Sequence, residues 1–480
     1  MDTYYWFNKK QQKFVKNIDT FYYSVYLCND FSSDTQDTAV FYFRHWVEEN
    51  CINPENIIEF EGDYPVILSI GGYAIYHYRF SSPDFFDIFF NTTLNQLNTP
   101  HFIIQLRSRC LWEDGVYKSF DDSFSFIQFI CEQFGLEVKE IKENRCDFCC
   151  HSNYLSEPEK FFDRDNFVKM WVGSVGRTKE KTKHYSNHIS VYDNLETETD
   201  YISIGKRGSK CFIRIYLKSK EVIQEGYKSF FFPIWLEYGL ISKYDLFCYE
   251  LAYKEKKWCF IDIARLKWAL QYDDTLSDLN RAFISDVISQ DKPDYPLIRK
   301  VAKTFTKPVT KIFNVEFQVM RDMSKSFCLV KKNQGITAHI YDYLDNFSLI
   351  YDYLTSVSFR LVRPDTLDSN KSRNENCAFW DRLRSSKCHN FKQKNKNVSL
   401  IRKYSSNINA ELKRIRALRA VASFGFSVTL NPDYDLYDDC VNLLNTLNDN
   451  DIKYLDDYKK KLQKKNIEEK PDKITGRACS

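Results

Sequence analysis

The sequence lacks the segments that carry proteins into or across membranes. No stretch approaches about eighteen consecutive uncharged apolar residues, the length that a membrane-spanning helix needs. The first residues, MDTYYWFNKKQQKF, do not form the basic segment followed by an apolar stretch that marks a secretory signal. We therefore expect a cytoplasmic protein with no membrane partner.

The cysteines lack the spacing of a disulfide scaffold. The 15 cysteines are scattered, and several lie in apolar, strand-like segments, as expected in a reducing compartment. One C-x-x-C step runs from Cys146 to Cys149, and Cys150 and His151 follow it. A structural zinc site normally draws a second ligand pair from elsewhere, and the chain has no second C-x-x-C. A zinc-containing interaction protein is therefore only a third, weaker hypothesis about function.

The chain also lacks a nucleotide-binding fingerprint and a strong net charge. A basic glycine turn, GKRGSK at residues 205–210, does not have the G-x-x-x-x-G-K-[ST] spacing of a Walker loop. This absence argues against an NTP-driven enzyme. The net charge of +3 is too slight to indicate a nucleic-acid-binding protein, so only the distribution of charge along the chain can support that function.

The chain does contain enough apolar surface for several domains. Of its 480 residues, 43% are hydrophobic and 16% are aromatic, so burial is not limiting. Short apolar strands meet through tight turns, as in YPVILSIGGYAIYHYRF at residues 64–80, and they alternate with helix-like segments. This pattern predicts an α+β fold, with a mostly antiparallel central sheet flanked by helices and a helical, basic C-terminal part.

Composition divides the chain into four parts. Residues 1–60 mix aromatic residues with short helical patterns and carry no evident chemistry, so we expect an N-terminal appendage. Residues 61–330 form the main α+β domain, residues 331–432 a mainly helical basic region, and residues 433–480 a charged C-terminal tail. Positive charge gathers at residues 371–419, where a solvated helix face explains it as well as DNA contact does.

A two-sided strand follows the basic glycine turn. Because side chains alternate across a strand, Arg214, Tyr216 and Lys218 lie on one face and an apolar set lies on the other. Backbone amides in a glycine turn can hold phosphate oxygens, and a tyrosine between cations is suited to attack or grip a phosphate. A cross-strand aromatic pair is the alternative interpretation of Tyr216.

A second two-sided strand lies in ENRCDFCCHS. Alternation predicts a polar face with Arg145, Asp147, Cys149 and His151, and an opposite face with Cys146, Phe148 and Cys150. About 13 Å separates Asp147 from His151 along a regular strand, so they share a metal ion only if the strand bends. A buried strand with a paired Asp and Arg is the alternative interpretation.

These segments occur in the order that is typical of one family. The chain resembles the replication initiation factor family, which comprises rolling-circle plasmid Rep proteins and the related relaxases of conjugative elements. In that family, a strand R-hydrophobic-D-x-x-x-D precedes a glycine-serine turn and the strand R-hydrophobic-Y-x-K-x-x-E. The matching residues are Arg145, Asp147 and His151, then Gly205, Ser209, Arg214, Tyr216, Lys218 and Glu221.

Further motifs of the family follow in the same order. After the tyrosine strand, the family has an acidic residue in a strand that follows a tryptophan, then F-R-F and N-x-S-R steps and a tryptophan-rich segment. The residues that resemble them are, in order, Trp235, Glu250, Arg360, Arg373 and Trp380. The resemblance covers residues 60–390, and it departs from the family pattern at His151, where a second acid is usual.

The resemblance implies that residues 61–330 nick DNA and that residues 331–432 complete a Rep-like fold. In the family, a tyrosine oxygen attacks a phosphodiester at the origin, leaving a 5′-phosphotyrosine and a free 3′-hydroxyl, and religation needs no ATP. By this resemblance Tyr216 is the nucleophile, assisted by Arg214 and Lys218. A phenol with a pKa of about 10 needs nearby cations or a metal ion to react at neutral pH.

The resemblance also implies a divalent metal ion and a DNA partner. We expect Asp147 with Glu221 or Glu250 to hold Mg²⁺ or Mn²⁺, and His151 to ligate the ion or to orient a ligand. The partner is double-stranded origin DNA with an extruded single-stranded hairpin; a host helicase and a second copy of the chain are further candidates. The residues expected to contact DNA are Lys206, Arg207, Lys210, Arg360 and Arg373. An origin-binding protein that does not cut DNA, built on the same scaffold, is the alternative function.

Overall fold

The computed structural model describes most of the chain. The described residues are 13–32, 35–36, 38–51, 57–58, 65–72, 74–93, 99–155, 164–173, 185–191, 197–290, 292–329, 334–337, 339–363, 373–391, 400–402, 417, 420–421, 423 and 436–468. Every statement about structure below concerns these residues.

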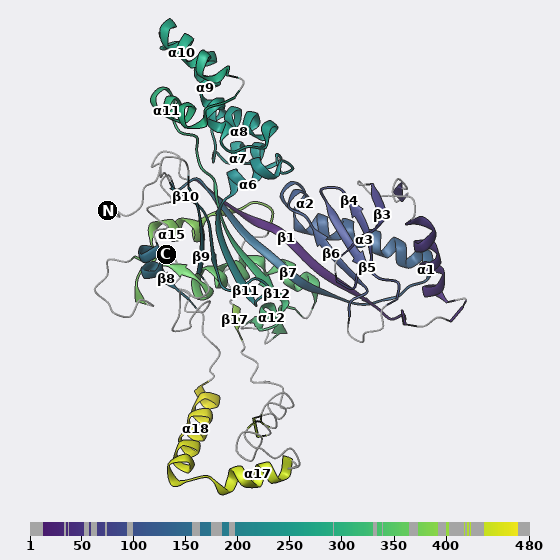
Figure 1. Ribbon diagram of the computed structural model, residues 1–480. Coiled ribbons are helices and arrows are strands. Elements are labelled where there is room, and N and C mark those ends of the chain that lie inside the picture. The colour runs from purple at the N-terminus through teal and green to yellow at the C-terminus, as the bar shows by residue number, and fades with distance from the viewer. Residues whose placement is uncertain are drawn as a thin grey trace. The chain divides into compact units, whose positions relative to one another are not determined.

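A twelve-stranded sheet organises the fold (Figure 1). Its strands are β1 (Phe14–Leu27), β2 (Ile57–Ile58), β3 (Val66–Ile70), β4 (Tyr78–Ser82), β5 (Phe86–Phe90), β6 (Phe102–Leu106), β7 (Val138–Ser152), β9 (Tyr185–Val191), β10 (Thr197–Ile204), β11 (Cys211–Leu217), β12 (Phe313–Met320) and β16 (Lys387–Cys388). Their spatial order is β2-β3-β4-β5-β6-β1-β7-β12-β11-β10-β9, and β16 pairs with β1. All pairs except β1 with β16 are antiparallel, so the predicted α+β fold with a mostly antiparallel sheet is confirmed.

Two smaller sheets and a set of helices complete the described chain. The remaining strands are β8 (Trp171–Val172), β13 (Phe327–Leu329), β14 (Gln334–Gly335), β15 (Arg360–Leu361) and β17 (Leu400–Arg402). The helices are α1 (Ala39–Asn50), α2 (Ser108–Glu113), α3 (Val116–Phe134), α5 (Arg164–Met170), α6 (Lys218–Glu225), α7 (Phe231–Glu237), α8 (Lys243–Glu255), α9 (Phe260–Tyr272), α10 (Asp278–Ile288), α11 (Tyr295–Phe305), α12 (Arg321–Ser324), α13 (Ile340–Asp345), α14 (Phe347–Tyr353), η1 (Leu354–Ser358), α15 (Ala378–Ser385), α17 (Leu436–Asn445) and α18 (Asp449–Glu468). None of the described helices is both long and apolar enough to cross a membrane.

The sequence signals for two of these elements have a clear physical basis. Gly71, with φ +136°, lies in the turn of the β3–β4 hairpin, because a residue with a Cβ atom rarely adopts that conformation. Gly135, with φ +69°, ends α3 in the left-handed conformation that is common at helix C-termini. Both glycines therefore stop regular structure where the chain must change direction.

One face of the central sheet is apolar and carries the main core. Phe148 and Phe317 project from β7 and β12 toward α14 and α15, where Phe148 meets Phe347 at a ring distance of 5.5 Å and Phe317 meets Trp380 at 6.3 Å. Near β1 the same face meets α3, because the Tyr23 ring lies 4.8 Å from that of Phe120. The alternation of side chains along β7 thus separates an apolar face from a polar one, as predicted.

The helices between β11 and β12 form a small core of their own. Buried Leu266, Ile284 and Ile298 bring α9, α10 and α11 together. Helix α8 starts at a capping box, in which the Ser242 hydroxyl accepts from the Asp245 amide and the Asp245 carboxylate accepts from Ser242. We expected Glu250 to lie in a strand, and this is wrong, because the capping box makes residues 243–255 a helix.

The chain forms two compact units. One consists of residues 1–325 and 336–397, and the other of residues 326–335 and 398–480. The second unit contains α17 and α18, which form within the segment that we expected to be a charged tail.

The N-terminal part of the chain is not an appendage. Strand β1 lies between β6 and β7 in the middle of the sheet, where it pairs with β7 along almost its whole length (Figure 1). The prediction for residues 1–60 is therefore wrong for this strand. Its buried polar residues escaped notice because the pairing joins segments more than 100 residues apart in the sequence.

Replacing a buried ring of β1 tests this position. Phe21 is fully buried and its ring lies about 6 Å from those of Tyr343 and Phe347. Phe21→Ala will lower the free energy of unfolding by about 3–5 kcal/mol, because it leaves a cavity between β1 and the helices. Urea unfolding measures this loss. Tyr42→Ala, which changes a ring that is 53% exposed, is the control and will cost about 0.5 kcal/mol or less. Equal, small losses would show that β1 does not belong to the core.

Candidate active site

The hydroxyl of Tyr216 lies at the centre of a buried hydrogen-bond network. Strand β11 pairs with β12 so that Tyr216 lies opposite Asn314. The hydroxyl donates to Glu316 Oε2 at 3.0 Å and accepts from Asn314 Nδ2 at 3.0 Å and from Lys218 Nζ at 3.3 Å. The phenol oxygen thus has one acceptor for its proton and two donors that would stabilise a negative charge.

Glu316 also receives the guanidinium of Arg214. Arg214 Nε donates to Glu316 Oε1 at 3.0 Å, and its guanidinium lies 5.5 Å from the centre of the Tyr216 ring. Glu316 is 1% exposed, whereas the Arg214 side chain is 30% exposed. Arg214 therefore connects the buried carboxylate to the surface of the sheet.

Burial controls the ionisation of Tyr216. Burial is the largest factor that raises the pKa of Tyr216 well above its ordinary value, and the negative charges of Glu221 and Glu316 raise it further. Lys218 opposes this shift without overcoming it. In the free protein, the phenol therefore keeps its proton at neutral pH, and it needs a base to react.

Lys218 is a fully buried cation held by two carboxylates. We expected it on the same strand face as Tyr216; instead it begins α6, directly after β11 ends. Its Nζ lies 3.2 Å from Asp19 Oδ2 and 3.0 Å from Glu221 Oε2. Burial alone would lower the pKa of Lys218, but the charges of Asp19 and Glu221 outweigh burial and raise it well above its ordinary value. The ammonium is therefore permanently charged.

Asp19 reaches the site because β1 has an irregularity. The register between β1 and β7 shifts between Ile18 and Thr20, and Asp19 lies at this shift. Its Oδ1 accepts from Ser108 Oγ at 2.9 Å and from Trp112 Nε1 at 3.2 Å. Burial favours a raised pKa for Asp19, but the charge of Lys218 lowers it below its ordinary range. Asp19 is therefore an anion in the segment from which we expected no chemistry.

Asp147 and Arg145 form a buried pair on the same face. Arg145 Nε donates to Asp147 Oδ1 at 2.8 Å, and Asp147 is 2% exposed. Burial raises the pKa of Asp147 to about 6, against the opposing effect of Arg145 and with a further rise from Glu316. The paired Asp and Arg that we gave as the alternative interpretation of this strand are present.

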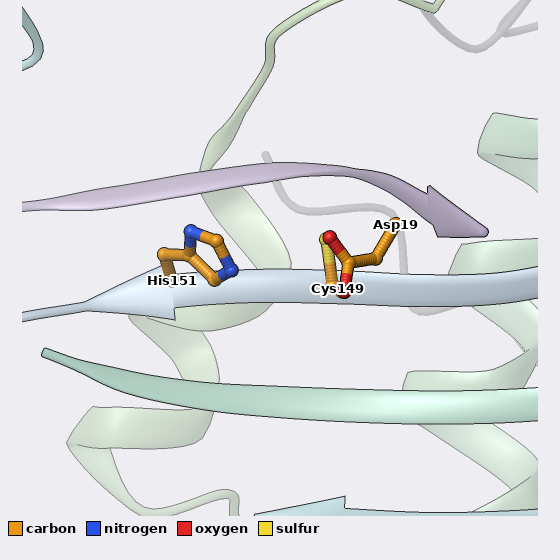
Figure 2. Close-up of side chains that lie close together, drawn as sticks. All are labelled: Asp19, Cys149 and His151. Atoms are coloured by element: carbon orange, nitrogen blue, oxygen red, sulfur yellow. The ribbon is translucent and has the colours of Figure 1, made fainter. Parts of the chain in front are cut away.

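Asp19, Cys149 and His151 form a candidate metal-binding group (Figure 2). One ligand atom from each residue lies within 4.8 Å of the others, and one ring nitrogen of His151 faces the other two side chains. The distances would allow an ion to be shared. Whether these residues fit a metal ion therefore depends on whether the ligand atoms of Cys149 and His151 carry protons.

The protonation of Cys149 and His151 opposes metal binding. The thiol of Cys149 donates to the carbonyl oxygen of Asn17, and burial raises its pKa well above the ordinary value. His151 Nδ1 accepts from Trp235 Nε1 at 3.1 Å, so the proton of the neutral ring lies on Nε2, which is buried without a partner. Burial lowers the pKa of His151 to about 3, and its ring stacks on Trp112 at 4.8 Å. The orphaned nitrogen is thus a donor and not a free lone pair.

The predicted metal ligands do not form a set for a hard cation. Asp147 is paired with Arg145, Glu221 with Lys218 and Lys228, and Glu250 is exposed on α8. Asp147 and His151 lie opposite different residues of β12, Gln318 and Asn314. Mg²⁺ or Mn²⁺ would have to displace a positively charged side chain from a carboxylate, so these residues as they are paired do not fit the ion.

The predicted DNA-contact residues lie in separate places. Lys206, Arg207 and Lys210 are exposed in the turn between β10 and β11. Arg360 lies in β15, where its Nη1 donates to the Asn374 carbonyl and the Asn376 side chain, each at 2.9 Å. Its neighbour Phe359 packs against Phe317 on the apolar face of the sheet. Tyr216 lies on the other face. Arg373 is exposed, and most of residues 371–419 lie outside the described residues.

Three residues of the site were missed in the sequence. Asn314 and Glu316 alternate with apolar residues in FNVEFQVM, which is the same signal that we used for Tyr216. Alternation could therefore have identified both. Asp19 has no such signal, because its position depends on the irregularity in β1.

Neither a protein-family model nor a curated protein matches the chain. Among solved structures, it is similar to the rolling circle replication initiator protein from Geobacillus stearothermophilus, with a TM-score of 0.34 and 10% sequence identity over 77% of this chain and 95% of that one.

The ion pairs of Glu221 predict a pH dependence of stability. Burial favours a raised pKa, but Lys218 and Lys228 lower the pKa of Glu221 from 4.5 to about 2. Because the folded-state pKa is the lower one, the stabilisation is present above about pH 4.5 and is lost as the pH falls through the folded-state value. At about 1.36 kcal/mol per pKa unit, wild type will lose roughly 3 kcal/mol more than Glu221→Gln over that interval.

Denaturant unfolding at a series of pH values measures this difference. Glu225→Gln, which changes an exposed carboxyl of the same helix, is the control and will follow the wild-type curve. Parallel curves for wild type and Glu221→Gln would contradict the buried ion pairs.

The tautomer of His151 predicts how the protein responds to metal ions. Zn²⁺ or Mn²⁺ will not raise the melting temperature of the wild-type protein, because a cation stabilises only a fold that binds it. Trp235→Phe removes the donor to Nδ1 and allows Nε2 to present a lone pair, so Zn²⁺ will raise the melting temperature of this variant alone. Thermal shift assays measure both. A rise in wild type that His151→Gln abolishes would identify a metal site instead.

Proposed function

We propose that this protein is a rolling-circle replication initiator or relaxase that nicks and religates one DNA strand at an origin through Tyr216. The observation that carries this proposal is the phenol held between a carboxylate acceptor and two hydrogen-bond donors. The order of the sequence motifs that resemble the replication initiation factor family supports it as well. The chain acts on DNA in the cytoplasm, without a membrane partner.

The geometry supports a transesterification step in which Glu316 is the base and Tyr216 the nucleophile. Glu316 takes the phenol proton while the Tyr216 oxygen attacks phosphorus and forms a phosphotyrosine with the 5′ end. The bond between phosphorus and the 3′ oxygen breaks, and this oxygen takes a proton from solvent to become the 3′-hydroxyl. Lys218 and Asn314 stabilise the developing negative charge on the phenol oxygen. Attack by the 3′-hydroxyl reverses the same steps, so religation needs no nucleotide.

Partly exposed cations on the same face suit a phosphodiester. The side chains of Arg214 and Arg145 are 30% and 24% exposed and lie above the buried carboxylates of Glu316 and Asp147. Guanidinium groups bind phosphate oxygens by paired hydrogen bonds. We assign both arginines to the scissile phosphate, while Lys206, Arg207 and Lys210 contact neighbouring phosphates.

The family resemblance implies Mg²⁺ or Mn²⁺, which would supply positive charge to the phosphate. The donor set does not fit such an ion, so the steps above run through side chains alone. A second candidate function is an origin-binding protein that does not cut. The burial of Tyr216 and its raised pKa favour this alternative.

Nicking of supercoiled plasmid separates the two functions. The substrate is a plasmid that carries the DNA surrounding the coding sequence, incubated with Mg²⁺, with Mn²⁺ or with EDTA. Wild type will produce open circles and a protein–DNA adduct that resists denaturation. Tyr216→Phe will abolish both, and Glu316→Gln will slow nicking by about 10²–10⁴-fold, since it removes the base.

Tyr201→Phe is the matched control, because Tyr201 lies opposite Tyr216 on β10. It will retain nicking. Binding of the plasmid by wild type without open circles or adduct in any of the three conditions would establish the non-cleaving function.

A further inference from the structure

A pocket of about 340 Å³ lies beside the network of Tyr216. Its wall includes Thr20 of β1, the end of β6 with the start of α2, and the loop that follows α6. None of the predicted site residues lines it. Its place on the same polar side of the sheet raises the question of what it binds.

The pocket wall shares two carboxylates with the nucleophile. Ser108 lines the pocket and donates to Asp19, while Lys228 lines the pocket and lies 2.5 Å from Glu221. Both carboxylates hold the ammonium of Lys218, which donates to the phenol oxygen. Each of these hydrogen bonds and ion pairs is 3.3 Å or shorter, so only a few side chains separate the pocket from the Tyr216 hydroxyl. A DNA strand with its scissile phosphate at Tyr216 would therefore reach the pocket within a few nucleotides.

The lining combines cations with aromatic rings. Arg107, Arg109 and Lys228 supply guanidinium and ammonium donors, and Tyr227 and Phe230 supply ring faces. Each of these cations also has a carboxylate partner: Arg107 pairs with Asp87 at 2.6 Å, Arg109 with Asp84 at 2.9 Å and Lys228 with Glu221 at 2.5 Å. Cations next to exposed aromatic rings are the usual elements of a site for unpaired nucleotides.

Exposure distinguishes the ring that is available for stacking. Tyr227 is 56% exposed, although its ring lies only 5.2 Å from the ammonium of Lys228. An exposed ring held beside a cation can stack a base while the cation contacts the adjoining phosphate. The cavity volume suits one small ligand and is too small for a duplex.

We propose that this pocket binds one unpaired nucleotide of the strand that Tyr216 cuts, with the base on Tyr227 and the phosphate beside Arg109 and Lys228. This assignment rests on the proposed function, because the strand must continue from the scissile phosphate. It assigns Tyr227 and Arg109 to substrate binding and not to bond breaking.

Binding of single-stranded DNA without cleavage tests the pocket. The probe is a fluorescent oligothymidylate of about 16 nucleotides, measured by anisotropy with full-length Tyr216→Phe protein. Adding Tyr227→Ala will weaken binding by roughly five- to a hundredfold, the usual effect of losing one stacking platform. Arg109→Ala will also weaken it, and by less at high salt. Tyr272→Ala, which changes a ring that is 51% exposed on α9, is the matched control and will bind normally.

The outcomes separate this proposal from the proposed function. Unchanged affinity in Tyr227→Ala and Arg109→Ala overturns the pocket, even if wild type nicks plasmid DNA. Weakened affinity in both supports the pocket, even if no nicking occurs, in which case the nuclease function fails alone. Displacement of the probe by equimolar thymidine monophosphate would identify a site for free nucleotides and overturn the strand assignment.

Discussion

The buried ammonium of Lys218 is the interaction on which the site depends. A buried charge costs several kcal/mol unless partners compensate it, and Lys218 has two carboxylates and the phenol of Tyr216. These partners come from β1, α6 and β11, so the ammonium joins segments as far as 199 residues apart. The position of β1 in the middle of the sheet brings Asp19 within reach of Lys218.

The pairing of charges on the polar face separates the groups that would bind phosphate from those that would transfer a proton. Four carboxylates near Tyr216 each have a Lys or Arg at ion-pair distance: Asp19 with Lys218, Asp147 with Arg145, Glu221 with Lys228 and Glu316 with Arg214. The carboxylates of Asp147 and Glu316 are more deeply buried than the arginines that pair with them. A phosphodiester that approaches this face would therefore meet cations first, while the groups that move a proton lie beneath them.

The parts of the fold that depend on neighbours in the chain were predictable. Alternation assigned the faces of β7 and β11, and a glycine marked the end of α3. Glu250 was placed wrongly because the family resemblance assigned it to a strand, and the capping signal at Ser242 was overlooked. Asp19 was missed for a different reason, since no local pattern reports an irregular register with a distant strand.

By itself, the sequence determined that Tyr216, Arg214 and Asp147 lie on polar faces of two strands, because the period of a strand is set by its own backbone. Only the tertiary structure decided that Glu316 accepts the proton of Tyr216, that Asp19 holds Lys218, and that the Trp235 donor fixes the tautomer of His151. Those relations depend on which strands and helices lie side by side. Burial then sets their strength, because hydrogen bonds and ion pairs are strongest where water is excluded.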